Sequence, residues 1–113
     1  METKQMLELA AKAAGYNVEL DYYGEGRHGL KSADIRIPPA IWNPLEDNAG
    51  AFRLAVQLGL FFSPVLSHHM ALVKFTGDVK NDCAAYRMAI TKAAAEIGMQ
   101  MIERETLANA SLR

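Results

Sequence analysis

The pattern of apolar and polar residues changes several times along the chain, and each change marks a predicted element. Residues 3–14 repeat at helical spacing, with Met6, Leu9, Ala10 and Ala13 on one face, and Gly15 is placed to end this helix. Alanine gives this segment high helix propensity but little side-chain volume. The helix should therefore pack closely against a neighbour instead of filling a wide gap.

The next two segments alternate between apolar and polar residues, which is typical of half-buried strands. They cover residues 17–23 and 30–37, and a glycine-rich stretch at 24–29 joins them. A short link of this kind predicts an antiparallel hairpin. Pro38 and Pro39 end the second strand, because neither residue can donate a backbone hydrogen bond.

A second helix is predicted in the middle of the chain and ends at Gly59. It starts either at Pro44, with Asn43 as its cap, or at Asn48, with Asp47 as its cap, and Gly50 favours the later start. A wide apolar stripe predicts that this is the most buried helix. Trp42, just before it, is predicted to be a buried structural anchor packed against it.

The last part of the chain predicts a strand followed by a long helix. Residues 67–75 are interpreted as a third strand with apolar side chains on both faces. Asn81 or Asp82 would cap a third helix, and Gly98 would end or fray it. The element order is then α-β-β-α-β-α, an α+β fold with a small antiparallel or mixed sheet. Residues 1–102 would form a single domain, and residues 103–113 a flexible tail.

Composition and charge narrow the class of protein. The chain has 113 residues, a formal net charge of −1 and one cysteine. A single cysteine excludes an internal disulfide framework and a multi-cysteine zinc site. The near-neutral charge argues against a general binder of polyanions. No apolar stretch is long enough to span a membrane, and the polar N-terminus does not resemble a signal peptide, so the expected compartment is the cytoplasm.

Two motifs suggest ligands that their context argues against. Residues 24–29 match G-x-G-x-x-G, but a strand follows them where a dinucleotide site needs a helix, so a flexible hairpin turn is the better interpretation. His68 and His69 are neighbours on a predicted strand and would point to opposite faces. We therefore expect one solvated and one partly buried histidine, with no metal site and no cofactor.

Two further sets of residues keep alternative functions open. Cys83 lies in the first turn of the predicted third helix, where it is either a small buried hydrophobe or a nucleophile assisted by His68 or His69. Arg27, Lys31 and Arg36 are possible nucleic-acid contacts near the hairpin. Acidic residues in the same region dilute this patch.

Three stretches together carry a resemblance to a known family: residues 7–15, residues 42–59 with their Trp-Asn-Pro start, and residues 85–94. They resemble the phage ABA sandwich domain, a family of small uncharacterised phage and prophage proteins. The resemblance implies a three-layer α/β/α sandwich, a bacteriophage or prophage origin and hence the bacterial cytoplasm. It supplies no catalytic residues.

The leading hypothesis is a small non-enzymatic accessory protein that acts by protein binding or self-assembly. Its partner would be a second copy or a phage or host protein. The contact would use an exposed face of the last helix or the apolar connection at residues 60–66. The first alternative is a nucleic-acid-associated module that uses the hairpin at residues 24–36. The second is an enzyme that uses Cys83.

Overall fold

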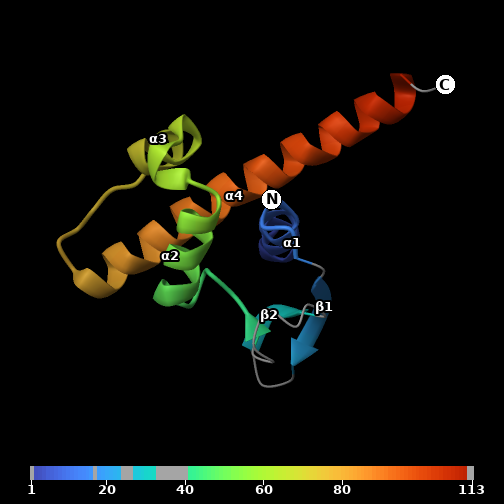
Figure 1. Cartoon of the computed structure of the whole chain (residues 1–113). Helices are drawn as coiled ribbons and strands as arrows, with labels where there is room; N and C mark the ends of the chain where they lie inside the picture. The colour runs from blue at the N-terminus through green and yellow to red at the C-terminus, as the bar shows by residue number, and fades with distance from the viewer. Residues whose placement is uncertain (1, 17, 24–26, 33–40, 112–113) are drawn as a thin grey trace.

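A computed structural model describes residues 2–16, 18–23, 27–32 and 41–111, and in the strands it describes the course of the backbone. This part of the chain contains four α-helices, a short 3-10 helix and a small sheet, and Figure 1 shows how they are arranged. In chain order the elements are α1 (Thr3–Ala13), β1 (Val18–Tyr23), β2 (Arg27–Ser32), β3 (Ile41–Trp42), α2 (Asn48–Gln57), η1 (Leu60–Phe62), α3 (Pro64–Ala71) and α4 (Val79–Ser111).

The helix α4 is the centre of the fold, and α1, α2 and α3 all pack against it (Figure 1). Its middle part is covered on several sides, so that Ile90, Thr91, Ala93 and Ala94 are fully buried. The hydroxyl of Thr91 donates to the carbonyl of Arg87 one turn earlier, at 2.8 Å, which satisfies this polar group inside the core.

Small residues let α1 and α4 approach each other closely. Ala10 and Ala11 of α1 and Ala93 to Ala95 of α4 are buried, and Gly98 lies against the backbone of Leu9. The close packing predicted from the alanines of the first helix is confirmed. Gly15 is also confirmed as the residue after the end of α1, because its φ of 78° is in the left-handed region.

The later of the two predicted starts of α2 is confirmed. Asp47 caps the helix, and its side chain accepts a hydrogen bond from the backbone N–H of Ala49 at 3.1 Å. Asn43 instead forms the preceding turn, where its Oδ1 accepts from the N–H of Leu45 at 3.0 Å. Arg87 of α4 holds this turn in place by donating from Nε to the carbonyl of Leu45 at 2.7 Å.

The three strands form an antiparallel sheet in the order β1-β2-β3, beside α1. In the hairpin, Val18 pairs with Ser32 and Tyr23 pairs with Arg27, so β2 begins three residues before the predicted position. Trp42 pairs with Leu30 in β3, but its side chain lies outside the described part of the structure. Its predicted anchoring role stays a prediction. Residues 24–26 and 33–40, which include Arg36, also lie outside it.

The predicted fold class is wrong, because the chain is not an α/β/α sandwich and does not follow the order α-β-β-α-β-α. Residues 67–71 of the predicted third strand at 67–75 belong to α3 instead, and the rest of that segment is part of an irregular connection that leads to α4. Ser63 caps α3 by accepting from the N–H of Val65 at 3.2 Å, and Pro64 occupies its first turn. A segment that is apolar on both faces fits a buried strand or a packed helix equally well, and the Ser-Pro start decides for the helix.

The predicted end of the last helix is also wrong. The helix α4 runs for 33 residues from Val79 to Ser111, so residues 103–111 of the predicted tail are helical and extend beyond the other elements (Figure 1). Alanine, glutamate, arginine and leucine favour this continuation, and no proline interrupts it. The prediction that the second helix is the most buried fails as well, because the middle of α4 takes that place.

Candidate functional site

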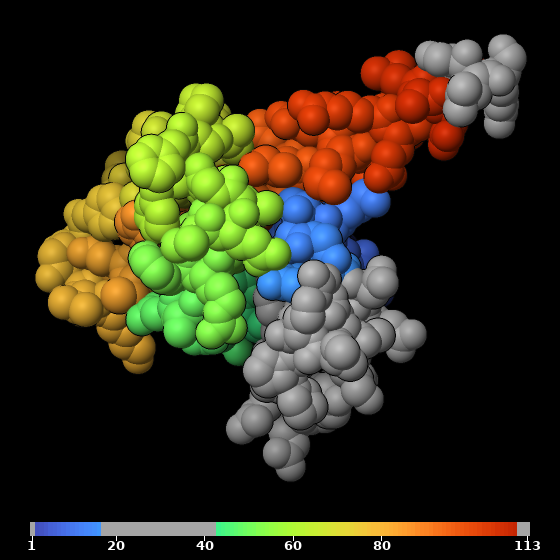
Figure 2. Space-filling view, viewed as in Figure 1, coloured from blue at the N-terminus to red at the C-terminus, as the bar shows by residue number. Residues whose placement is uncertain are grey.

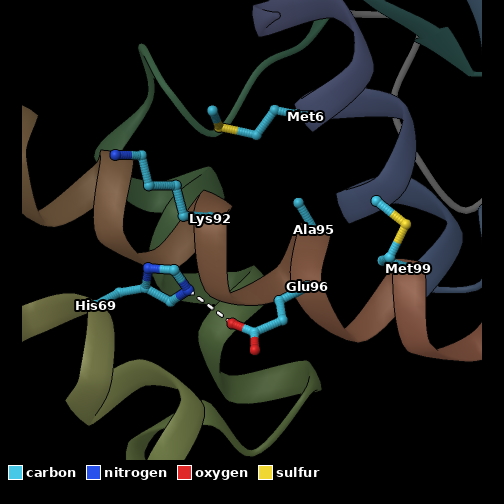
Figure 3. A pocket seen from close by; sticks show the side chains of 6 residues that line it. All are labelled: Met6, His69, Lys92, Ala95, Glu96 and Met99. Carbon is cyan, nitrogen blue, oxygen red and sulfur yellow. Dashed lines mark hydrogen bonds and ion pairs between the residues drawn. The ribbon is translucent and has the colours of Figure 1, made fainter. Parts of the chain in front are cut away.

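A cleft of about 440 Å³ opens between α1, α3 and α4. Its walls carry two thioethers, one small apolar residue and three ionisable groups: Met6, Met99, Ala95, His69, Lys92 and Glu96. Figure 3 shows the ring of His69 turned toward the carboxylate of Glu96, with the two methionines on the side of α1. The volume of the cleft is within the range of small-molecule sites, and such sites also combine apolar residues with a few polar groups.

The central polar contact of this cleft joins α3 to α4. Nε2 of His69 lies 2.8 Å from Oε2 of Glu96, and the side chain of His69 is much less exposed than that of Glu96. The contact satisfies a partly buried ring nitrogen that would otherwise lose its hydrogen bond to water. Among the residues that the structure describes, the cleft lining includes no serine, threonine or cysteine. The His69–Glu96 pair thus links α3 to α4 at the cleft.

The expectation for the two adjacent histidines holds, although its stated reason was wrong. His68 is exposed and His69 is partly buried, as predicted. The two residues lie on a helix, where successive side chains are about 100° apart, and their rings contact each other edge to face with centroids 5.5 Å apart. The sequence signal that would have assigned both histidines to a helix is the Ser63-Pro64 helix start, which comes shortly before them.

Cys83 lies far from the histidines of α3. His69 contacts Glu96, which is 13 residues beyond Cys83 on α4, and this corresponds to about 20 Å along the helix axis. The ring of His68 is 5.5 Å from that of His69 and belongs to the same end of the molecule. Neither residue can act as a base for the Cys83 thiol, so the proposed pairing of Cys83 with His68 or His69 is wrong.

Asp82 organises the connection that leads into α4. Its Oδ1 accepts from the backbone N–H of Thr76 at 2.8 Å and from the Thr76 hydroxyl at 3.1 Å, and its Oδ2 accepts from the N–H of Gly77 at 2.9 Å. These hydrogen bonds, with the Thr76 N–H as the largest contribution, lower the pKa of the Asp82 carboxyl from its usual 3.8. The predicted capping role of Asp82 is therefore replaced by a role in the preceding turn.

The predicted nucleic-acid contacts Arg27, Lys31 and Arg36 stay a prediction, because their side chains lie outside the described part of the chain. The backbone pairing sets Lys31 opposite Glu19 and Arg27 opposite Tyr23. Lys31 and Glu19, which carry opposite charges, are thus paired across the two strands, as the mixed composition suggested.

A second candidate site is an aromatic surface on α2 and η1. Phe52 is 62% exposed, Val56 55%, Phe61 43% and Phe62 96%, and we call these four residues the aromatic face. The rings of Phe52 and Phe61 lie 5.8 Å apart, which joins the two elements into one surface. Figure 2 shows α2 and the segment after it on the side of the molecule that faces the viewer.

Sequence reasoning found only half of this surface. The apolar connection at residues 60–66 was predicted to be a contact region, and Phe61 and Phe62 lie in it. The wide apolar stripe predicted for the second helix includes Phe52, Ala55 and Val56, with Ala51 and Leu54 beside them. Of these residues Ala51, Leu54 and Ala55 are buried, and Phe52 and Val56 are exposed. Because α2 is apolar on both sides, helical spacing alone could not select the inner one.

Comparison with known proteins gives no match: no family model, no curated protein and no solved structure matches this chain. Among the described residues, no group of three or more histidine, cysteine, aspartate or glutamate side chains is arranged to hold a metal ion. None of the described helices combines the length and apolar character needed to cross a membrane.

Proposed function

We propose that this protein is a small non-enzymatic binding module and that the aromatic face is its contact surface. The observation that carries this proposal is the exposure of Phe52, Phe61 and Phe62 together on α2 and η1. Exposed single apolar residues are common on proteins, but adjoining aromatic side chains are enriched in protein interfaces.

The polar groups of the molecule support a binding role more than a catalytic one. His69 is engaged with Glu96, Arg87 with the turn before α2, and Asp82 with the connection before α4. Each of these contacts has a structural purpose, and the described residues that line the cleft include no serine, threonine or cysteine beside His69 and Glu96. The phage or prophage origin and the bacterial cytoplasm, which the family resemblance implies, complete the proposal.

Affinity capture from bacterial cells that produce the tagged chain tests this function. The comparison uses Phe52→Asp and Phe62→Asp against Phe75→Asp, a phenylalanine of similar exposure that lies in the connection before α4. We expect wild type and the Phe75 variant to retain the same specific protein, either an untagged copy or another protein, and the two face variants to lose it. Equal recovery by all four chains, or no specific protein with any of them, contradicts the proposal.

A further inference from the structure

We propose that the aromatic face is a homodimer interface, in which α2 of one copy packs antiparallel against α2 of a second copy. The inference rests on the proposed function, because it names the partner of the same surface. It starts from the sides of α2 that are already occupied. Ala51, Leu54 and Ala55 are buried in the core, and Gln57 donates from Nε2 to the carbonyl of Ala14 at the end of α1 at 2.9 Å.

The remaining side of α2 has the spacing of a helix-packing surface. Ala49, Phe52 and Val56 are all exposed and follow each other at intervals of three and four residues. Such a row lies along one side of a helix and can be covered by a second helix. Phe61 of η1 widens the row beside α2, since its ring lies 5.8 Å from that of Phe52.

The area of this surface fits the needs of a dimer. Phe52, Phe61 and Phe62 are exposed to 62%, 43% and 96%, which amounts to about two complete phenylalanine side chains or roughly 400 Å² of apolar surface. A standard interface buries about 800 Å² on each partner, of which somewhat more than half is apolar. The aromatic face with Val56 thus supplies approximately the apolar part of one such interface.

The row is also complementary to itself when the two helices run antiparallel. If the two-fold axis passes between Phe52 and Arg53, then Ala49 faces the partner's Val56, so that a small residue meets a larger one. The same register brings the exposed Arg53 over the partner's Phe52, where a cation–π contact is favourable. A parallel arrangement would instead bring the two Arg53 side chains together.

Analytical ultracentrifugation of the full chain from micromolar to millimolar concentration tests the association. We expect a reversible dimer whose dissociation constant rises about tenfold or more in Phe52→Asp, because truncating a central aromatic anchor has an effect of this size. Phe75→Asp should dimerise like the wild type. Both substituted side chains are exposed, and matching thermal unfolding curves would show that the variants remain folded.

Disulfide trapping tests the register separately. In a Cys83→Ser background, chains with Ala49→Cys and chains with Val56→Cys, distinguished by mass, are mixed and oxidised. We expect the mixed disulfide to exceed either pair of identical chains, because equivalent positions lie about 10 Å apart along the antiparallel helices. A dominant Ala49→Cys homodimer would overturn the antiparallel register.

The two proposals fail in different ways. A wild-type chain that stays monomeric at every concentration overturns the homodimer. If capture from cells then still depends on Phe52, the proposed function survives with a different protein as its partner. If capture is also independent of Phe52, both proposals are overturned.

Discussion

Gly98 of α4 lies directly against the backbone of Leu9 in α1. A Cβ atom at position 98 would be 2.0 Å from the carbonyl oxygen of Leu9 and 2.8 Å from its carbonyl carbon. The neighbouring group is backbone, which cannot turn aside as a flexible side chain could. The crossing distance between the two helices therefore depends on the absence of a side chain at this one residue.

Gly98→Ala is expected to lower the free energy of unfolding by about 2–3 kcal/mol, because α1 must move away from α4 to admit the methyl group. The expected sign is informative, since alanine in a helix interior usually stabilises by about 1 kcal/mol relative to glycine. Urea unfolding provides the measurement. Gly50→Ala is the comparison, because its Cβ would meet the side chain of the capping Asp47 and no backbone atom of a neighbouring helix, and it should stay within about 1 kcal/mol of wild type. A stabilised Gly98→Ala variant would contradict the close crossing.

Arg87→Ala is expected to destabilise the fold by about 2 kcal/mol. Arg87 donates to the carbonyl of Leu45 and from Nη1 to Oδ1 of Asn48, and its loss leaves these acceptors without that charged donor. Arg87→Lys should recover only part of the loss, because an ammonium group cannot reproduce both directions of the guanidinium.

Thermal and urea unfolding measure the effect of these Arg87 variants. The matched control is Arg104→Ala, an exposed arginine on the same helix, which should change stability by less than about 0.5 kcal/mol. If Arg87→Ala and Arg104→Ala behave alike, Arg87 does not hold the turn before α2.

The amide resonances of Thr76 and Gly77 should titrate with Asp82 at a midpoint below 3.8. The pKa of Asp82 is lowered chiefly by the Thr76 N–H, so the folded form of this connection is favoured while the carboxylate is charged. Its contribution is complete above the ordinary carboxyl pKa and is lost as the pH falls through the lower folded value. NMR spectra recorded from neutral to acidic pH give the midpoint. Asp82→Asn should abolish this titration, and a midpoint at or above 3.8 would refute the arrangement.

A double-mutant cycle on His69→Ala and Glu96→Ala should give a coupling free energy of about 0.5–1 kcal/mol, because the pair is partly exposed. The Lys12–Glu105 pair, at 3.3 Å and with both side chains more exposed to water, is the control and should show a smaller coupling. Unfolding at neutral pH measures both cycles. A His69–Glu96 coupling no larger than that of the control pair would mean that the contact does not clamp α3 onto α4.

The local signals of the sequence were informative where one residue determines one backbone conformation. Gly15 and Gly59 adopt the left-handed φ expected after a helix, and Asp47 caps α2 as expected. The alternation of residues 18–23 likewise coincides with β1. These features need only the chain neighbours of each residue, so the sequence is sufficient to predict them.

Neither candidate site could be predicted from the local sequence pattern, because each depends on which distant element packs against it. The cleft exists because α3 brings His69 to Glu96 across 27 positions in sequence, and the mistaken strand at residues 67–75 concealed this contact. The aromatic face was concealed in the same way, because α2 offers an apolar row on either side.

By itself, the sequence determined the Asp47 cap, the helix ends at Gly15 and Gly59 and the close approach expected of an alanine-rich first helix. Only the tertiary structure decided that α4 is the central helix, that Leu54 faces the core while Phe52 faces water, and that Gly98 is a crossing point instead of a helix end. The physical reason is that capping and φ preferences act within a few residues. Burial, in contrast, is a property of whichever distant element supplies the neighbouring surface.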